Sequence, residues 1–163
     1  IHYVYTNRAT TTGQRLALEL QIYTSRAHAV EGLIKGEVDL MRAEPAVYVS
    51  ARRHTSQIIP LVQEVYGDGK LDMGAAIFTR TNSGIDTFGQ LKGKSFALGE
   101  RNSTLGDYLT KAELVTHDLR AGDFLRITNV TSDLGLAEVG GGRCDAGVSS
   151  LDHVAPFAKA VRT

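Results

Sequence analysis

The chain has 163 residues, enough for one ordinary domain or two small lobes, and its 42% hydrophobic and 22% charged residues are typical of a globular protein. Eighteen basic residues balance eighteen acidic ones, so no net charge attracts a nucleic acid or an acidic membrane, and no nucleic-acid partner is predicted. The single cysteine, Cys144, excludes an internal disulfide, and no apolar run is as long as a membrane helix.

Strand-like and helical patterns alternate along the chain. Apolar residues at helical spacing predict a helix that ends at Gly36, and Pro45 is placed to open the next one. Such alternation is typical of an α/β fold with a parallel sheet. Strands or extended segments are expected at 1–5, 16–23, 38–41, 58–65, 74–79, 94–98, 126–130 and 145–148, and helices at 26–35, 45–53, 103–115, 133–139 and 152–161.

One arrangement of residues occurs twice. The segments GLIKGEVDLM and EVGGGRCDAGV both read helix, glycine, two residues, aspartate and apolar strand, with the aspartates at Asp39 and Asp145. Joins of this kind occur in any α/β protein, but two copies with the aspartate in the same place indicate two similar lobes. We expect lobe 1 at residues 1–75 and lobe 2 at residues 76–163, with a hinge strand near 74–80.

The fold is expected to be truncated. Residues 6–16 leave little room for a full crossover helix, which with its loops needs about a dozen residues or more. Either that helix is reduced or residues are missing. The last residues, Val161-Arg-Thr163, resemble the start of another strand, so the return of the chain to lobe 1 is expected to be absent.

Three segments together resemble a known family. They are GLIKGEVDLMRAEPAVYV, GIDTFGQLKGKSFALGERNSTLGDYL and GGRCDAGVSSLD. In order and spacing they resemble the periplasmic phosphonate- and phosphate-binding proteins of ABC importers, which are type 2 periplasmic binding proteins. The most specific part is LKGKSFALGERNSTLGDYL, because the family has a leucine-lysine-glycine-lysine turn, a strand, and a serine-threonine pair at a helix start.

The resemblance implies two α/β lobes that close on a ligand in the cleft between them, with Ser103 and Thr104 on the phosphonate oxygens. It further implies an extracytoplasmic solute-binding protein that captures a small oxyanion (phosphonate, phosphate or phosphite-like) for an ABC permease. Such a protein is periplasmic or extracellular, with or without a membrane anchor. Two alternatives stay open: the ligand-sensing domain of a membrane receptor, and an enzyme on the same fold.

The residues around Ser103 have the chemistry of an anion site. A helix start leaves backbone N–H groups without partners and is electropositive, so an oxyanion is a natural occupant. The hydroxyls of Ser103 and Thr104 and the amide of Asn102 add donors, and Gly106 lets the first turn approach a ligand closely. Taken alone, these residues favour an ordinary N-cap. Together with the resemblance, they predict an anion site.

A second set of candidates lies in the predicted first lobe. Glu44 stands where relatives usually carry a small residue. Two interpretations are open: the carboxylate binds an ammonium group of the ligand, or it is a solvated acid at a helix start, where the helix dipole favours it. Tyr48, one turn into the same helix, lines the cleft or packs in the core. Tyr66 stands where relatives place an aromatic residue in contact with the ligand, or packs at the hinge.

The remaining candidates follow later strands. Ser132 begins a helix where relatives often have a histidine, and Asp152 begins another where relatives use acidic residues; each binds the ligand or caps its helix. An enzyme site is the weaker interpretation, because Cys144 with His117 or His153 is the only nucleophile–base candidate and Cys144 fits a small buried residue better. No metal-ligand spacing or phosphate loop occurs, so no catalytic residue, metal or cofactor is predicted.

Overall fold

The computed structural model describes residues 19–63 and 73–160. Contacts divide the chain into two compact units, Ile1–Val62 and Gln63–Thr163, and each is described by itself. The described part of the first unit holds two helices, α1 (Arg26–Lys35) and α2 (Pro45–His54). Both begin and end as the sequence predicts to within a residue, because Ser25 caps α1, Gly36 ends it and Pro45 opens α2.

A small apolar cluster joins the two helices of the first unit. Val30 of α1 packs with Val47 and Ala51 of α2, and Met41 and Ile58 pack against them. The side chains come from helical positions that lie on one face of each helix. This cluster is the core of the first unit as far as residues 19–63 show it.

Residues 19–63 contain no β-strand. The strand expected at 38–41 is therefore wrong, and so is the described part of the strand expected at 16–23. A strand needs a neighbour that pairs with its backbone N–H and C=O groups, and a favourable side-chain pattern does not supply one. Residues 58–63 belong to no helix or strand, and Ile59, Leu61 and Val62 are exposed there.

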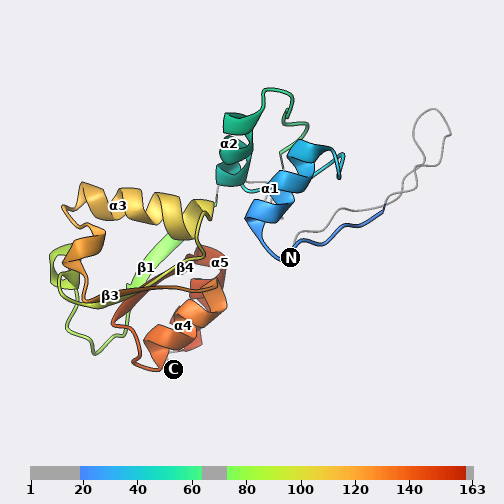
Figure 1. Ribbon diagram of the computed structural model, residues 1–163. Helices are drawn as coiled ribbons and strands as arrows, with labels where there is room; N and C mark the ends of the chain where they lie inside the picture. The colour runs from blue at the N-terminus through green and yellow to red at the C-terminus, as the bar shows by residue number, and fades with distance from the viewer. Residues whose placement is uncertain (1–18, 64–72, 161–163) are drawn as a thin grey trace. The chain divides into compact units, whose positions relative to one another are not determined.

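The second unit is built on a four-stranded sheet in the order β1-β4-β2-β3. Short helical turns and the helices α3 and α4 connect the strands, and α5 follows the last strand (Figure 1). In chain order the elements are β1 (Ala75–Thr79), η1 (Phe88–Leu91), β2 (Ser95–Leu98), η2 (Thr104–Leu109), α3 (Thr110–Thr116), η3 (Ala121–Asp123), β3 (Arg126–Asn129), α4 (Ser132–Gly140), β4 (Ala146–Ser150) and α5 (Leu151–Ala160).

The parallel sheet expected from the sequence is correct for three strands of the four. Strand β2 pairs in parallel with β3 and with β4. Strand β1 is antiparallel to β4, with Ala75 opposite Ser150 and Thr79 opposite Ala146. Antiparallel edge strands on parallel sheets are common, and alternation of strands and helices carries no information on the direction of an edge strand. The prediction of an all-parallel sheet is wrong at β1 for this reason.

The two faces of the sheet are covered by different helices. Phe96 and Leu98 of β2 join the cluster that contains Leu114 of α3, whereas Ala97 between them packs with Val139 of α4. This period of two is that of a strand buried on both faces. Figure 1 shows the arrangement, with α3 on one face and α4 and α5 on the other.

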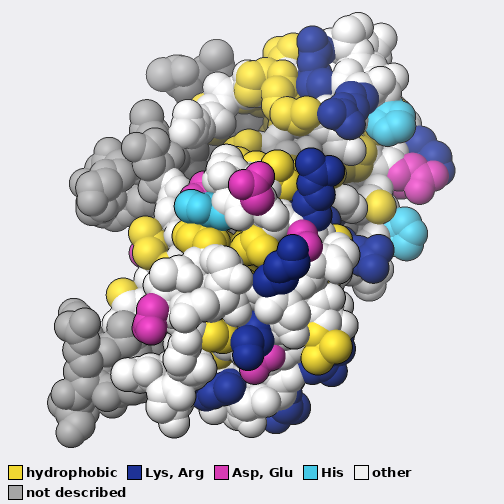
Figure 2. Space-filling model, turned by 90° about the vertical axis from the view of Figure 1, so that its left-hand side faces the viewer, with side chains coloured by type: hydrophobic (Ala, Val, Ile, Leu, Met, Phe, Trp, Pro, Cys, Tyr) yellow, Lys and Arg dark blue, Asp and Glu magenta, His cyan; other side chains and the backbone are white. Residues whose placement is uncertain are grey.

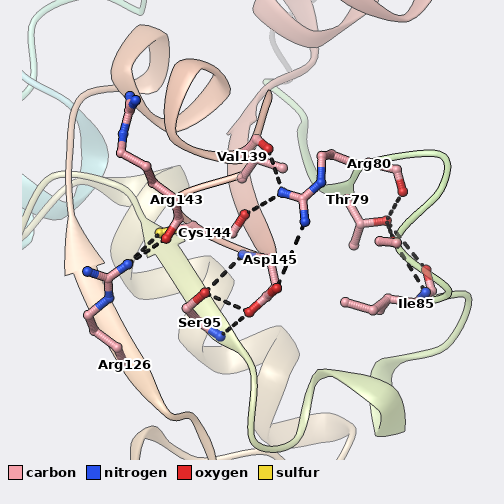
Figure 3. A network of polar contacts seen from close by, with 10 residues as sticks. Thr79, Arg80, Ile85, Ser95, Arg126, Val139, Arg143, Cys144 and Asp145 are labelled. Atoms are coloured by element: carbon pink, nitrogen blue, oxygen red, sulfur yellow. Dashed lines mark hydrogen bonds and ion pairs between the residues drawn. The ribbon is translucent and has the colours of Figure 1, made fainter. Parts of the chain in front are cut away.

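A polar network ties the amino ends of β2 and β4 to the end of β1 (Figure 3). One carboxylate oxygen of Asp145 accepts hydrogen bonds from the N–H of Ser95 at 2.8 Å and from its hydroxyl at 2.7 Å. Arg80 donates to the carbonyl oxygens of Val139 and Cys144, at 2.7 and 2.9 Å. The two hydrogen bonds from Ser95 hold the pKa of Asp145 below its ordinary value, and the bond from the hydroxyl has the larger effect. The network fixes where the two strands start.

Candidate ligand-binding site

The carboxyl ends of β2, β3 and β4 lie at one edge of the second unit's sheet, because the three strands run in parallel. A helix begins after each of them. Polar groups at such an edge, next to helix starts, are the usual ligand contacts of open α/β sheets. The predicted residues Ser103, Ser132 and Asp152 follow β2, β3 and β4 in this way.

The helical run after β2 is anchored directly to the end of that strand. It consists of the π-helical turn η2 followed by α3, residues 104–116 without a break. The N–H of Gly99 donates to the carbonyl oxygen of Gly106 at 2.9 Å. A Cβ on Gly99 would lie 2.4 Å from the Cα of Gly106, so the two backbones touch where only glycine fits. The close approach that Gly106 allows is therefore used by the backbone at the end of β2.

Ser103 is the central residue of the candidate site. It occupies the N-cap position of the run with extended backbone angles, yet its side chain makes no cap hydrogen bond. The residue is 8% exposed, and its hydroxyl has no hydrogen-bond partner in the described part of the chain. Buried hydroxyls are normally paired, so one without a partner calls for an explanation. A ligand oxygen is a partner of the required kind.

Two backbone N–H groups lie beside this hydroxyl. The first hydrogen bond that enters the turn runs from the N–H of Tyr108 to the carbonyl oxygen of Ser103, at 3.1 Å. The N–H groups of Leu105 and Gly106 precede it and have no acceptor within the helix. Half-buried Thr104 lies between them and Ser103. The start of the run therefore combines hydroxyl and amide donors with the positive end of the helix dipole.

Asn102 differs from Ser103 in its exposure and its backbone conformation. Its side chain is exposed, and its amide oxygen accepts a hydrogen bond from the Tyr108 hydroxyl at 3.3 Å. Its backbone is left-handed, with φ of 64°. Its N–H donates to a carboxylate oxygen of Asp107 at 2.7 Å. Asp107 was not among the residues singled out from the sequence.

The helices after β3 and β4 begin with the other predicted residues. Thr131 is the N-cap of α4 and Ser132 is the first helical residue, half-buried. Asp152 is exposed in the first turn of α5. Ser149, at the end of β4, is 3% exposed and its hydroxyl has no partner among the described residues. The sequence places Ser149 at a strand end but carries no signal that its hydroxyl is buried and unpaired.

The candidates of the first unit lie on or next to α2. The carboxylate of Glu44, the N-cap residue, accepts a hydrogen bond from the guanidinium of Arg26 at 2.7 Å. Glu44 therefore has a cationic partner within its own unit, which neither interpretation of the sequence foresaw. Tyr48 is half-buried on α2. Tyr66 lies outside the described residues.

The candidate nucleophile is buried and placed away from both histidines. Cys144 is 1% exposed, and burial raises the pKa of its thiol above the ordinary value. His117 stacks on Phe88 with ring centroids 3.7 Å apart, and His153 lies 3.7 Å from a carboxylate oxygen of Asp133. Over residues 19–63 and 73–160, no group of three or more His, Cys, Asp or Glu residues is arranged to hold a metal ion.

Charged side chains of both signs share the face drawn in Figure 2. On the face in Figure 2, Lys and Arg side chains lie beside Asp and Glu side chains, in keeping with the balance of eighteen basic and eighteen acidic residues. Among the helices that the structure describes, none has the length and apolar character needed to cross a membrane.

The family of the chain follows from a comparison with protein-family models. The model described as "ABC transporter, phosphonate, periplasmic substrate-binding protein" matches residues 8–161, nearly the whole sequence. The chain therefore belongs to this family of periplasmic substrate-binding proteins of ABC transporters, and the resemblance seen in the sequence is confirmed. The family is one of binding proteins.

Solved structures share the fold. A binding protein component of an ABC phosphonate transporter from Pseudomonas aeruginosa has a TM-score of 0.68 and 15% identity, over 85% of this chain and 47% of that one. PhnD1 from Prochlorococcus marinus, in complex with methylphosphonate, has a TM-score of 0.70 and 20% identity, over 84% and 53%. A Xanthomonas citri protein bound to ATP has a TM-score of 0.70 and 24% identity, over 86% and 54%.

These matches confirm the predicted α/β fold of the type 2 periplasmic binding proteins. The chain spans about half the length of the solved proteins that it matches, 47% and 53% for the first two. At 15–24% identity the likeness shows the fold alone.

Proposed function

We propose that the chain is the ligand-binding part of an extracytoplasmic solute-binding protein that captures a small oxyanion for an ABC importer. The ligand is a phosphonate, phosphate or phosphite-like compound. Capture is non-covalent: donors arranged in advance at a helix start replace the water around the anion. The permease of an ABC importer is the partner that this function requires.

The observation that carries the proposal is the hydroxyl of Ser103. It is buried, has no partner in the described part of the chain, and lies at the start of a 13-residue helical run formed by residues 104–116. The amides of Leu105 and Gly106 have no acceptor within that run. An oxyanion supplies an acceptor to all of these donors at once, and the helix dipole favours its charge.

The other candidates are proposed as further contacts with the same ligand. Thr104 adds a hydroxyl next to Ser103, and Asn102, Ser132 and Asp152 lie at the edge of the sheet where β2, β3 and β4 end. For Glu44, Tyr48 and Tyr66, support comes from the family resemblance. An ammonium group on the ligand would compete with Arg26 for the carboxylate of Glu44.

Titration calorimetry tests the proposal. The wild-type protein is titrated with methylphosphonate, phosphate, phosphite and sulfate, and the same titrations are repeated on the Ser103→Ala, Thr104→Ala double variant. A hydrogen bond to a charged group contributes about 1.5–3 kcal/mol, so loss of both hydroxyls is expected to weaken binding about 100-fold or more.

Thr116→Ala is the matched control. Thr116 lies at the other end of α3, and its hydroxyl donates to the carbonyl oxygen of Glu113, within the same turn. This variant is expected to bind the oxyanions as the wild type does. A wild type that binds none of the four anions, or a double variant with unchanged affinity, would contradict the proposal.

A further inference from the structure

A buried carboxylate lies in the first turn of the helical run that begins at the candidate anion site. Asp107 is 3% exposed and belongs to η2, four residues after Ser103. A negative charge in this place ought to repel an oxyanion, so the residue calls for a role that outweighs the repulsion. The contacts of its two carboxylate oxygens indicate that role.

Each oxygen of Asp107 has a separate partner. One accepts the hydrogen bond from the backbone N–H of Asn102, at 2.7 Å. The other forms an ion pair with the ammonium group of Lys111, one helical turn further on. The ion pair offsets the charge of the carboxylate, which leaves its effect on a nearby anion small. The hydrogen bond to Asn102 is the contact that reaches the site.

Asn102 holds a backbone conformation that needs support. Its φ of 64° is left-handed, a region that residues with a Cβ seldom adopt, although asparagine does so more readily than most. Ser103, the next residue, returns to extended angles of −74° and 147°. The left-handed residue therefore sets the direction in which the chain enters Ser103 and the donors that follow it.

We propose that Asp107 is a positioning residue for the anion site. Its carboxylate holds the N–H of Asn102 and so keeps that residue left-handed, which aims the Ser103 hydroxyl and the amides after it at the ligand. The inference rests on the proposed function. Asp107 does not touch the ligand and acts through Asn102. The Tyr108 hydroxyl, which donates to the side-chain oxygen of Asn102 at 3.3 Å, supports the same conformation from outside.

The test compares two substitutions of Asp107 by their affinity for methylphosphonate and for phosphate. Asp107→Asn keeps an oxygen that accepts the Asn102 hydrogen bond but removes the charge. Asp107→Ala removes both. A positioning role predicts that Asp107→Asn binds within about 3-fold of the wild type and that Asp107→Ala binds at least about 10-fold more weakly. A purely electrostatic role predicts the opposite: both variants bind the anions more tightly.

Substitutions of Asn102 test the conformation by itself. Glycine adopts a left-handed φ freely and alanine does not. Both variants lack the side-chain amide of Asn102, so a difference between them reports the backbone conformation, and Asn102→Gly is expected to bind the anions at least about 10-fold more tightly than Asn102→Ala. When Asp107→Ala is added to Asn102→Gly, it is expected to cause at most half of the logarithmic loss in affinity that it causes in the wild type.

Three outcomes would overturn the inference: Asp107→Ala with wild-type or tighter affinity, the same loss from Asp107→Ala in the Asn102→Gly background as in the wild type, or equal affinities of Asn102→Gly and Asn102→Ala. Circular dichroism shows whether each variant is folded, and if Asp107→Ala is not, the two Asn102 variants decide. A wild type that binds none of the oxyanions removes the proposed function and this inference together. A wild type that binds them, with Asp107→Ala unchanged, removes the inference alone.

Discussion

Two turns, one in each unit, have the same sequence arrangement and the same local geometry. In both, a glycine with left-handed φ follows a helix: Gly36, at 73°, comes directly after α1, and Gly142, at 75°, comes two residues after Gly140, the last residue of α4. The hydrogen bonds around the two glycines also correspond, in a pattern that is common at helix ends. The bonds are Gly36 N–H to Leu33 O and Glu37 N–H to Gly32 O in the first turn, and Gly142 N–H to Val139 O and Arg143 N–H to Glu138 O in the second.

The two segments differ from the third residue after the glycine onward. Asp145 directly precedes β4, and its carboxylate accepts hydrogen bonds from the backbone N–H and the hydroxyl of Ser95. Asp39 is exposed, and no strand follows it in the described residues. The second unit offers β2 as a parallel neighbour to β4. The comparison teaches that the glycine turn forms from its own few residues, whereas the strand after it forms only where a partner strand is present.

The largest difference in unfolding free energy between matched variants of the two turns is expected when their aspartates are substituted. Asp145→Ala leaves the N–H and hydroxyl of buried Ser95 without their acceptor, which costs about 1–3 kcal/mol of unfolding free energy. Asp39→Ala removes an exposed carboxylate and is expected to stay within about 0.5 kcal/mol of the wild type.

Urea unfolding followed by circular dichroism measures these changes, and hydrogen exchange assigns them to residues 19–63 or 73–160. Asp145→Asn is the control, because its side-chain oxygen can still accept from Ser95. Equal losses of stability for Asp39→Ala and Asp145→Ala would contradict the difference drawn between the two units.

A smaller effect, and an equal one, is expected for the two glycines. Alanine in a left-handed conformation costs about 1 kcal/mol. At Gly36 an added Cβ meets nothing within 4 Å, and at Gly142 the nearest atom is a guanidinium nitrogen of Arg80 at 3.9 Å. Strain alone therefore acts at both sites. The local opening free energies from hydrogen exchange are expected to fall by similar amounts in Gly36→Ala and Gly142→Ala, and a difference above about 1 kcal/mol would show that the turns are not equivalent.

The smallest effect is a pH dependence of the second turn. The hydrogen bonds from Ser95 lower the pKa of Asp145 in the folded protein. The stability that they contribute is fully present above the ordinary aspartate pKa of about 3.9 and is lost as the pH falls through the lower folded pKa. Urea midpoints measured from pH 7 down to pH 2.5 are expected to fall less steeply in Asp145→Asn than in the wild type. A parallel course of the wild-type and Asp145→Asn curves would contradict the assignment.

The helices were predictable because their signals are local. Ser25, Pro45 and Gly36 define ends that the structure reproduces to within a residue. The strands at 94–98 and 126–130 were also predicted to within a residue at either end, the first because Phe96, Ala97 and Leu98 form a buried apolar run. The strand expected at 38–41 has an equally favourable pattern and does not form, since pattern alone does not provide the neighbour.

The candidate site was predictable in part. A serine-threonine pair at a helix start after a strand is a sequence signal, and the structure places Ser103 at that position. Within the described residues the hydroxyls of Ser103 and Ser149 have no partner, and Asp107 contacts Asn102. These features depend on which groups the fold brings together. No spacing in the sequence encodes them.

By itself the sequence determined the helix ends, the glycine turns and the family, because these depend on residues a few positions apart or on motifs in fixed order. Only the tertiary structure decided that β1 runs antiparallel, that Asp145 rather than Asp39 anchors a strand, and that the hydroxyl of Ser103 is buried without a partner among residues 19–63 and 73–160. The physical reason is the same in each case: hydrogen bonds across a sheet and burial depend on neighbours that are distant in the chain.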